Sequence, residues 1–204
     1  MIIVVEGASA AGKTTWCRTH GGSNALLEAL PDPASVPTEL EAAARFWVDR
    51  NVARWQDALE REARNGLVVV DTDPFKLHYV WSLWRTGQAT ELEWTVQRDA
   101  ARAAFAAERY ALADIFLVAD VDAGTLQMRR AADTTRTRRN FDVHFKLHDT
   151  TIAWYRAIES LEPGRVVFGL PADGITPELL AKGKRATRSG LELFDRLMRE
   201  LVAF

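Results

Sequence analysis

The chain has 204 residues, of which 48% are hydrophobic and 26% are charged, and its formal net charge is −2 at pH 7. The length suits one domain with a sizeable core, so we expect a single domain over residues 1–204. A near-neutral charge without a basic half argues against nucleic acid or a membrane surface as a partner. The lone Cys17 excludes an internal disulfide framework, and the sequence shows neither a signal peptide nor an apolar run of membrane-spanning length. We therefore expect a cytoplasmic protein.

Short apolar runs alternate with helical patterns along the whole chain. The expected elements, in order, are a strand at 2–5, a helix at 13–20, a weak strand at 25–30, a helix at 38–64, a strand at 67–70, a helix at 74–84, a helix at 91–111, a strand at 114–119, a helix at 123–130, a helix at 143–161, a strand at 165–168 and terminal helices from 177. Expected helix caps are Thr38 and Thr90, each with a glutamate three residues later, and Asp122 and Asp142. The alternation predicts an α/β fold of three layers, with a five-stranded parallel sheet between helices.

The first strand runs into a loop of small residues, GASAAGKT. The segment from Gly7 to Thr14 matches the phosphate-loop pattern G-x-x-x-x-G-K-[ST], and it lies between a strand and a helix as that pattern requires. Glycines allow the backbone N–H groups to turn toward phosphate oxygens, and the following helix N-terminus favours negative charge. Lys13 is expected to reach the β and γ phosphates, and the Thr14 hydroxyl to bind Mg²⁺. The expected nucleotide-binding residues of this loop are Gly7, Ser9, Ala10, Ala11, Gly12, Lys13, Thr14 and Thr15.

A phosphate loop alone does not separate a switch from a motor or a kinase. The guanine-reading motif N-K-x-D is absent from the sequence, which disfavours a regulatory GTPase. The chain is also short for a motor ATPase, so a small kinase is the class that remains. In loop, spacing and element order the sequence resembles the small P-loop kinases of the nucleoside, nucleotide and antibiotic group, most of all deoxyribonucleoside and thymidylate kinases.

That resemblance implies ATP and Mg²⁺ as cofactors and an acidic acceptor site. In these families the second strand ends in a carboxylate that serves as base or binds the acceptor hydroxyl, which implies Glu28 here, with Asp32 as the alternative. The third strand ends in an acidic residue followed by arginine. This chain reads VVVDTDPF, so Asp71 takes the acidic position, as base or in the metal shell, while Thr72 replaces the arginine. Asp73 is an additional carboxylate, and a turn residue before a proline is its alternative interpretation.

An arginine-rich segment, RRAADTTRTRRNFD, follows the fourth strand and a short helix. It resembles the lid of these kinases, whose arginines close over the triphosphate and neutralise charge as the phosphoryl group leaves. We expect a lid at about 129–141, with Arg136 and Arg138 as catalytic residues and Arg130 as a nucleotide contact. Arg129 is expected to face water. The alternative is a solvated basic helix face.

Aromatic residues gather in the segments expected to frame the acceptor. They are Phe46, Trp47, Phe75, Tyr79, Trp81 and Trp84, and for any one of them a place in the core is the better interpretation. We expect a small-molecule acceptor with a hydroxyl group, either nucleoside-like or an antibiotic or specialised metabolite. Two alternatives stay open, a regulatory nucleotide-binding protein with slow hydrolysis and an assembly module that associates through Leu191, Leu197 and Leu201. A homodimer is also left open.

Overall fold

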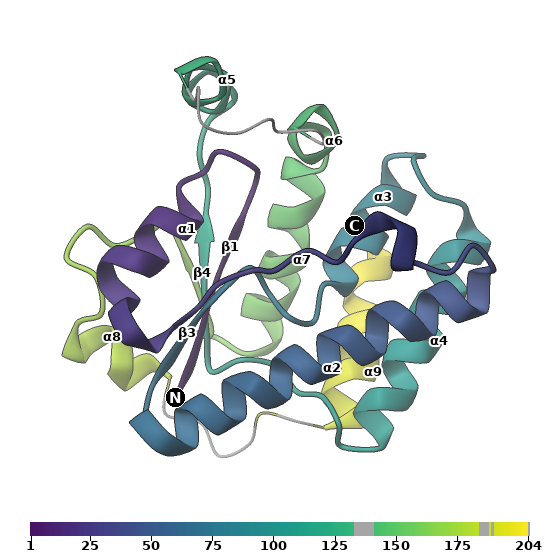
Figure 1. The fold of residues 1–204 in the computed structure, drawn as a ribbon, viewed down its shortest axis with the longest axis horizontal. Helices are drawn as coiled ribbons and strands as arrows, with labels where there is room; N and C mark the ends of the chain where they lie inside the picture. The colour runs from purple at the N-terminus through teal and green to yellow at the C-terminus, as the bar shows by residue number, and fades with distance from the viewer. Residues whose placement is uncertain (133–140, 184–187, 189, 204) are drawn as a thin grey trace.

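The structure is a computed structural model that describes residues 1–132, 141–183, 188 and 190–203. Its centre is a sheet of five parallel strands in the order β2-β3-β1-β4-β5 (Figure 1). The strands are β1 (Ile2–Gly7), β2 (Ala25–Leu26), β3 (Val68–Asp71), β4 (Ile115–Ala119) and β5 (Val166–Phe168). The predicted α/β class with a five-stranded parallel sheet is confirmed.

Helices cover both faces of the sheet. They are α1 (Lys13–Trp16), α2 (Leu40–Asn65), α3 (Leu77–Arg85), α4 (Glu91–Ala106), α5 (Ala123–Ala132), α6 (Phe141–Lys146), α7 (His148–Leu161), α8 (Pro177–Lys182) and α9 (Leu191–Glu200), with a π-helical turn at Cys17–Gly21 and short 3₁₀ turns at Gly22–Asn24, Pro33–Ser35 and Leu201–Ala203. Alternate side chains of β1 point to opposite faces, so Ile2 and Val4 pack with α2, α4, α7 and α9, whereas Ile3 and Val5 pack with α1 and α8. Both faces being covered explains why every residue of β1, β3 and β4 is buried.

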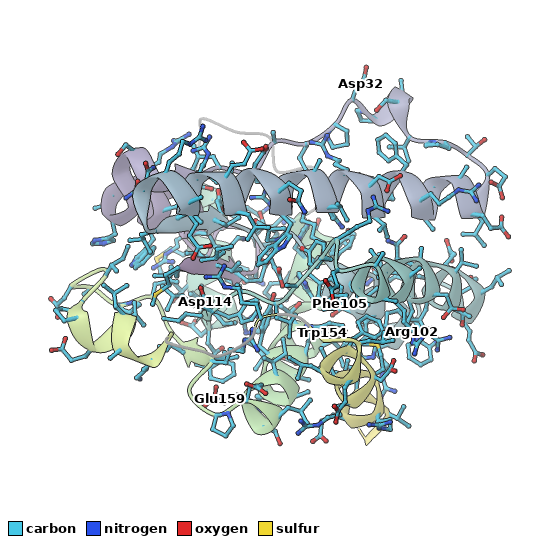
Figure 2. The ribbon with its side chains drawn as sticks, turned by 90° about the horizontal axis from the view of Figure 1, so that it is seen from below. Asp32, Arg102, Phe105, Asp114, Trp154 and Glu159 are labelled. Atoms are coloured by element: carbon cyan, nitrogen blue, oxygen red, sulfur yellow. The ribbon has the colours of Figure 1, made fainter. Side chains whose placement is uncertain are left out.

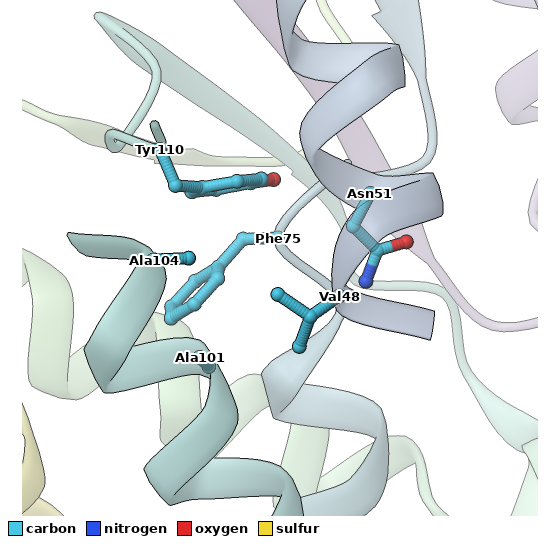
Figure 3. A pocket seen from close by; sticks show the side chains of 6 residues that line it. All are labelled: Val48, Asn51, Phe75, Ala101, Ala104 and Tyr110. Atoms are coloured by element: carbon cyan, nitrogen blue, oxygen red, sulfur yellow. The ribbon is translucent and has the colours of Figure 1, made fainter. Parts of the chain in front are cut away.

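The larger core is rich in aromatic rings. Figure 2 shows Phe105 and Trp154 in the interior between α2 and α9, and Phe75 packs its ring against both of them. A small apolar pocket remains between α2 and α4 (Figure 3), lined by Val48, Asn51, Phe75, Ala101, Ala104 and Tyr110. The C-terminal leucines belong to this core as well, because Leu197 and Leu201 are buried. These two are therefore not free to form the association surface of the assembly alternative, whereas Leu191, the third leucine named for it, is only partly buried.

The register of the strands brings the candidate site residues together at one edge of the sheet. In β1, Val5 is paired with Asp71 of β3, and Gly7 is paired with Ala119 of β4. The carboxyl ends of these parallel strands therefore meet where the β1–α1 loop begins. Figure 1 shows α5 and α6 on this same side, and Leu126 and Phe141 from these helices pack against the loop alanines.

Several predicted boundaries are wrong at element ends. β2 pairs only at Ala25 and Leu26, because the chain turns irregular before the prolines at 31 and 33. Thr38 does not cap α2. The N-cap is Glu39, whose carboxylate accepts from the backbone N–H groups of Glu41 and Ala42 at 3.1 and 2.8 Å.

The helix expected at 143–161 is two helices, α6 and α7, which meet at Leu147. Asp142 lies inside the first turn of α6 instead of capping it, and its carboxylate binds the Arg130 guanidinium at 2.6 Å. The caps at Thr90 and Asp122 are confirmed by their hydrogen bonds to Glu93 and Thr125. None of the described helices is long and apolar enough to span a membrane.

Candidate active site

The phosphate loop is shaped by residues with unusual backbone angles. Gly7 has φ 141°, and a Cβ there would lie 2.8 Å from the carbonyl oxygen of Ala119, so only glycine fits this close crossing of β1 and β4. Ala10 and Gly12 have φ values of 70° and 97°. The Lys13 ammonium folds back over the loop and donates to the carbonyl oxygens of Gly7 and Ala8 at 2.6 and 3.1 Å. The positive charge of Lys13 therefore lies next to the backbone of this loop.

The other predicted loop residues differ in their surroundings. Ala11 is buried and packs with α5 and α6, and its carbonyl accepts from Arg129 at 3.2 Å. Thr15 has an exposed side chain on α1.

The loop and the third strand meet through Thr14 and Asp71. The Thr14 hydroxyl donates to Oδ2 of Asp71 at 2.7 Å. The second carboxylate oxygen, Oδ1, is buried and has no hydrogen-bond partner among the described residues. Burial raises the pKa of Asp71, and the Thr14 hydrogen bond and the Lys13 charge oppose that rise. The structure therefore brings together the two residues that sequence reasoning chose for the metal.

This pair fits a hydrated Mg²⁺. A hydroxyl and a carboxylate are hard oxygen donors, and Mg²⁺ at nucleotide sites keeps several waters and takes other ligands from the phosphates. The orphaned Oδ1 of Asp71 is an acceptor that such a hydrated ion would satisfy. Within the described residues no group of three or more His, Cys, Asp or Glu side chains forms a metal cluster.

Glu28 lies at the same edge, two residues beyond the last pairing of β2. Its Oε1 accepts from the Lys76 ammonium, and its Oε2 accepts from the Thr72 hydroxyl at 3.4 Å. Burial works to raise the pKa of Glu28, but the Lys76 charge and hydrogen bond outweigh it, so the pKa lies below its ordinary value. Asp32 makes a different contact, because it caps the exposed 3₁₀ turn at Pro33–Ser35.

Cations stand near the position where Thr72 replaces the expected arginine. Arg54 of α2 donates to the backbone carbonyl oxygens of Asp71 and Thr72, the latter at 2.9 Å. Thr72 has φ 70°, a left-handed conformation that turns its carbonyl toward this guanidinium. Lys76 supplies a second cation from the segment before α3. The sequence motif alone did not reveal either contribution, because both depend on the packing of α2 and α3.

A buried polar network beneath the loop escaped sequence reasoning. Glu6 accepts from the backbone N–H groups of Gly7 and Asp73 at 2.8 and 2.9 Å, and its Oε2 lies 3.5 Å from Nε2 of His78. Burial lowers the pKa of His78 to about 4, so this ring is neutral at pH 7. Glu6 interrupts an apolar run directly before the phosphate loop, and that was the one sequence feature that marked it.

Asp73 belongs to this network. Its carboxylate accepts from the backbone N–H of Phe75 and from the Tyr155 hydroxyl, both at 2.9 Å, and only 2% of the residue is exposed. Burial, together with the nearby Glu6 charge, raises the pKa of Asp73 to about 7. The contact with Phe75 agrees with the turn interpretation, and the contact with α7 shows that this turn is also tied to the core.

The predicted lid lies largely outside the described residues. Arg136 and Arg138, expected to be catalytic, both fall in the segment 133–140. Of the flanking arginines, Arg129 is exposed to water, as expected, and its guanidinium also donates to the carbonyl oxygen of Ala11 in the loop. Arg130 lies over the Phe141 ring at 4.5 Å and pairs with Asp142. The arginine nearer the phosphate loop is therefore Arg129.

Of the six aromatic residues expected near the acceptor, some are buried in the core and others are partly exposed. Phe75 and Trp81 are buried in the core, as the simpler interpretation held, whereas Phe46, Trp47, Tyr79 and Trp84 are partly exposed. The Tyr79 ring faces His144 of α6, with 5.5 Å between ring centroids. Cys17 is a packed thiol, and burial raises its pKa to about 12.

The strand order and the phosphate loop at the end of β1 define the fold class of the P-loop kinases. Among solved structures, deoxyadenosine kinase from M. mycoides with bound dATP shares this fold with a TM-score of 0.54 and 11% identity, over 82% of this chain and 90% of that chain. The same kinase with its products dCMP and a flexible dCDP bound has a TM-score of 0.55 and 12% identity, over 100% of both chains. No protein-family model and no curated protein matches the sequence. The chain therefore has the fold of the deoxyadenosine kinases, as the sequence resemblance implied.

Proposed function

We propose that the chain is an ATP- and Mg²⁺-dependent kinase that transfers the γ-phosphoryl group to a hydroxyl of a small, nucleoside-like molecule. The observation that carries this proposal is the 2.7 Å contact between the Thr14 hydroxyl and Asp71, which joins a phosphate loop to a carboxylate at the end of the neighbouring strand. Lys13 and Glu28 lie at this same edge of the sheet. Phosphoryl transfer requires little more than such positioning and charge.

Each residue has a distinct role in this proposal. Backbone amides from Ser9 to Lys13 hold the phosphates, and the Lys13 ammonium moves from its carbonyl partners to the β and γ oxygens. Thr14 and Asp71 would hold Mg²⁺, which supplies charge neutralisation on the phosphates. Glu28 accepts the proton of the acceptor hydroxyl. The oxygen of that hydroxyl bonds to the γ-phosphorus, and the bond from the γ-phosphorus to the ADP oxygen breaks.

The nucleoside class of acceptor is supported by the solved neighbours, which are deoxyadenosine kinases. Because Thr72 stands in place of the expected arginine, an antibiotic or specialised metabolite remains the alternative acceptor. The proposal takes residues 1–204 as one kinase domain that works in the cytoplasm, without a nucleic-acid or membrane partner. Arg136 and Arg138 are proposed to close over the triphosphate.

ADP release with ATP and Mg²⁺ tests the proposal against a panel of nucleosides, nucleotides, amino sugars and hydroxylated antibiotics. We expect acceptor-dependent ADP release with one class, and a loss of at least about 100-fold for Lys13→Ala, because this cation stabilises the charge that develops in the transition state. Lys182→Ala, a change at an exposed position of α8, serves as the matched control. Tight nucleotide binding without transfer to any acceptor would favour a regulatory protein instead.

A further inference from the structure

The proposed base, Glu28, lies on a segment that the sheet does not hold. β2 ends at Leu26, so the backbone at Glu28 has no strand pairing to fix it. Its neighbour Leu27 packs against the α1 face of the sheet, and the backbone carbonyl of the exposed Ala29 accepts from the Arg50 guanidinium of α2. A base must nevertheless be held within hydrogen-bond reach of the proton it accepts. These neighbouring contacts do not fix the carboxylate itself, so the position of the Glu28 carboxylate depends on the contacts of its own side chain.

Lys76 makes the strongest of these contacts. Its ammonium forms an ion pair with Oε1 of Glu28, and both side chains are about 30% exposed, at 31% and 28%. The contact spans 48 positions in the sequence and joins the segment after β2 to the start of α3. The Thr72 hydroxyl, at 3.4 Å, is the weaker partner of the other carboxylate oxygen.

The backbone conformation at Lys76 is held by its neighbours, and it directs the Lys76 side chain toward Glu28. Phe75 and Leu77 on either side are buried in the core, so Lys76 is the one side chain of the three that extends into the site. It has φ 45°, a conformation that is uncommon for a residue other than glycine. The turn that imposes this angle is anchored at Asp73, through its contacts with Phe75 and Tyr155.

We propose that Lys76 is a positioning residue, which holds the Glu28 carboxylate in place and ionised at the acceptor edge of the sheet. This inference rests on the proposed function. Other charged or titratable groups around Glu28 are Arg54 of α2, Glu6 of β1, Asp71 of β3 and His144 of α6, whose pKa is lowered by burial. Glu6 and Asp71 oppose ionisation of Glu28, and Arg54 already donates to backbone carbonyls, so Lys76 supplies the cation that Glu28 contacts directly.

The test measures titration and catalysis separately in Lys76→Met, Lys76→Arg and the control Lys182→Met. Side-chain ¹³C NMR, with the Glu28 signal identified by its loss in Glu28→Gln, follows the pKa of Glu28 without any need for turnover. We expect this pKa to rise in Lys76→Met and to stay near the wild-type value in Lys76→Arg and in the control. A rise of about one pH unit lowers the ionised fraction about tenfold at acidic pH. The acid limb of kcat against pH should move to higher pH by a similar amount.

The outcomes distinguish the two proposals. If wild-type chain transfers phosphate while Lys76→Met retains both the wild-type titration of Glu28 and the wild-type acid limb, the inference about Lys76 is wrong and the proposed function stands. If the titration shifts as expected but wild-type chain phosphorylates no acceptor, the proposed function fails. Circular dichroism of each variant checks the fold, and a folded Lys76→Arg with a raised Glu28 pKa would also contradict the inference.

Discussion

The carboxylates around the phosphate loop have the same chemistry but different environments, and these environments assign their roles. Asp71 faces Thr14 and keeps one oxygen without a hydrogen-bond partner in the part of the chain that the structure describes, Glu28 is paired with Lys76, and Asp73 is enclosed by Phe75 and Tyr155. The first is suited to a cation, the second to a proton from an acceptor, and the third to structure. These differences arise from burial and hydrogen bonding, because the residue types alone are nearly interchangeable.

At Thr14 the hydroxyl, and not the volume of the side chain, should matter. We expect Thr14→Val to raise the Mg²⁺ concentration required for half-maximal activity by about tenfold or more, because it removes an oxygen ligand and leaves Asp71 without its donor. Thr14→Ser keeps the hydroxyl and should stay within a few-fold of wild type. Titrating activity with Mg²⁺ at saturating ATP measures the difference. Equal Mg²⁺ requirements in wild type and Thr14→Val would remove Thr14 from the metal site.

Asp73 should make the stability of the fold depend on pH. Its pKa is about 7 in the folded chain, because of burial, and about 3.9 when unfolded, so the folded state binds more protons between these values. The contribution of Asp73 to the free energy of unfolding therefore falls as the pH rises from about 4 to about 7. Asp73→Asn keeps the carbonyl acceptor and removes the titratable group. The unfolding free energy of this variant minus that of wild type should therefore increase by about 1 to 3 kcal/mol as the pH is raised from 5 to 8. Urea unfolding at the two pH values measures this, and a pH-independent difference would contradict it.

At the scale of elements, helix starts show how local rules succeed and where they fail. Thr90 and Glu93 form the full capping box that their spacing predicts, whereas Thr38 and Glu41 have the same spacing and form none. The difference is one residue, since Glu39 takes the cap of α2 with its own carboxylate. We expect Thr90→Ala to lower the free energy of unfolding by about 1 kcal/mol and Thr38→Ala, the matched control, to change it by only a few tenths. Urea unfolding compares them, and equal losses would contradict the observed caps.

Local patterns were sufficient for the fold and for the position of the Gly7–Thr14 loop between β1 and α1, because both depend on short segments of the sequence. The strand runs, the Gly7–Thr14 motif and the placement of Asp71 after β3 each need only neighbouring residues. The acceptor site could not be predicted in the same way. Lys76 contacts Glu28 from 48 positions away, and Arg54 reaches the end of β3 from the middle of a helix. Such contacts depend on how α2 and α3 pack, which periodicity does not specify. Glu6 was missed for a related reason, since a buried charge inside an apolar run acquires partners only in three dimensions.

At the scale of the whole molecule, the edge of the sheet opposite the phosphate loop is held together by an ion-pair network. Arg188, in the segment before α9, donates to Glu62 at the end of α2 and to Asp114 just before β4. Asp114, labelled in Figure 2, also accepts from the backbone N–H of Ile2 at 2.7 Å. The network therefore ties the start of β1 to the approach of α9, far from the carboxyl ends of the strands.

This location separates stability from catalysis. We expect Arg188→Met to lower the free energy of unfolding by about 1 to 3 kcal/mol, because Asp114 is buried and would lose a charged partner. The exposed pair between Arg102 and Asp195 provides the control, and Arg102→Met should cost less than about 1 kcal/mol, since water screens that contact. Urea unfolding measures both losses, and ADP release at a temperature where both variants remain folded should match wild type within about twofold. A large loss of turnover in folded Arg188→Met would mean that this edge of the sheet communicates with the phosphate loop, a coupling for which β1 is the direct physical path.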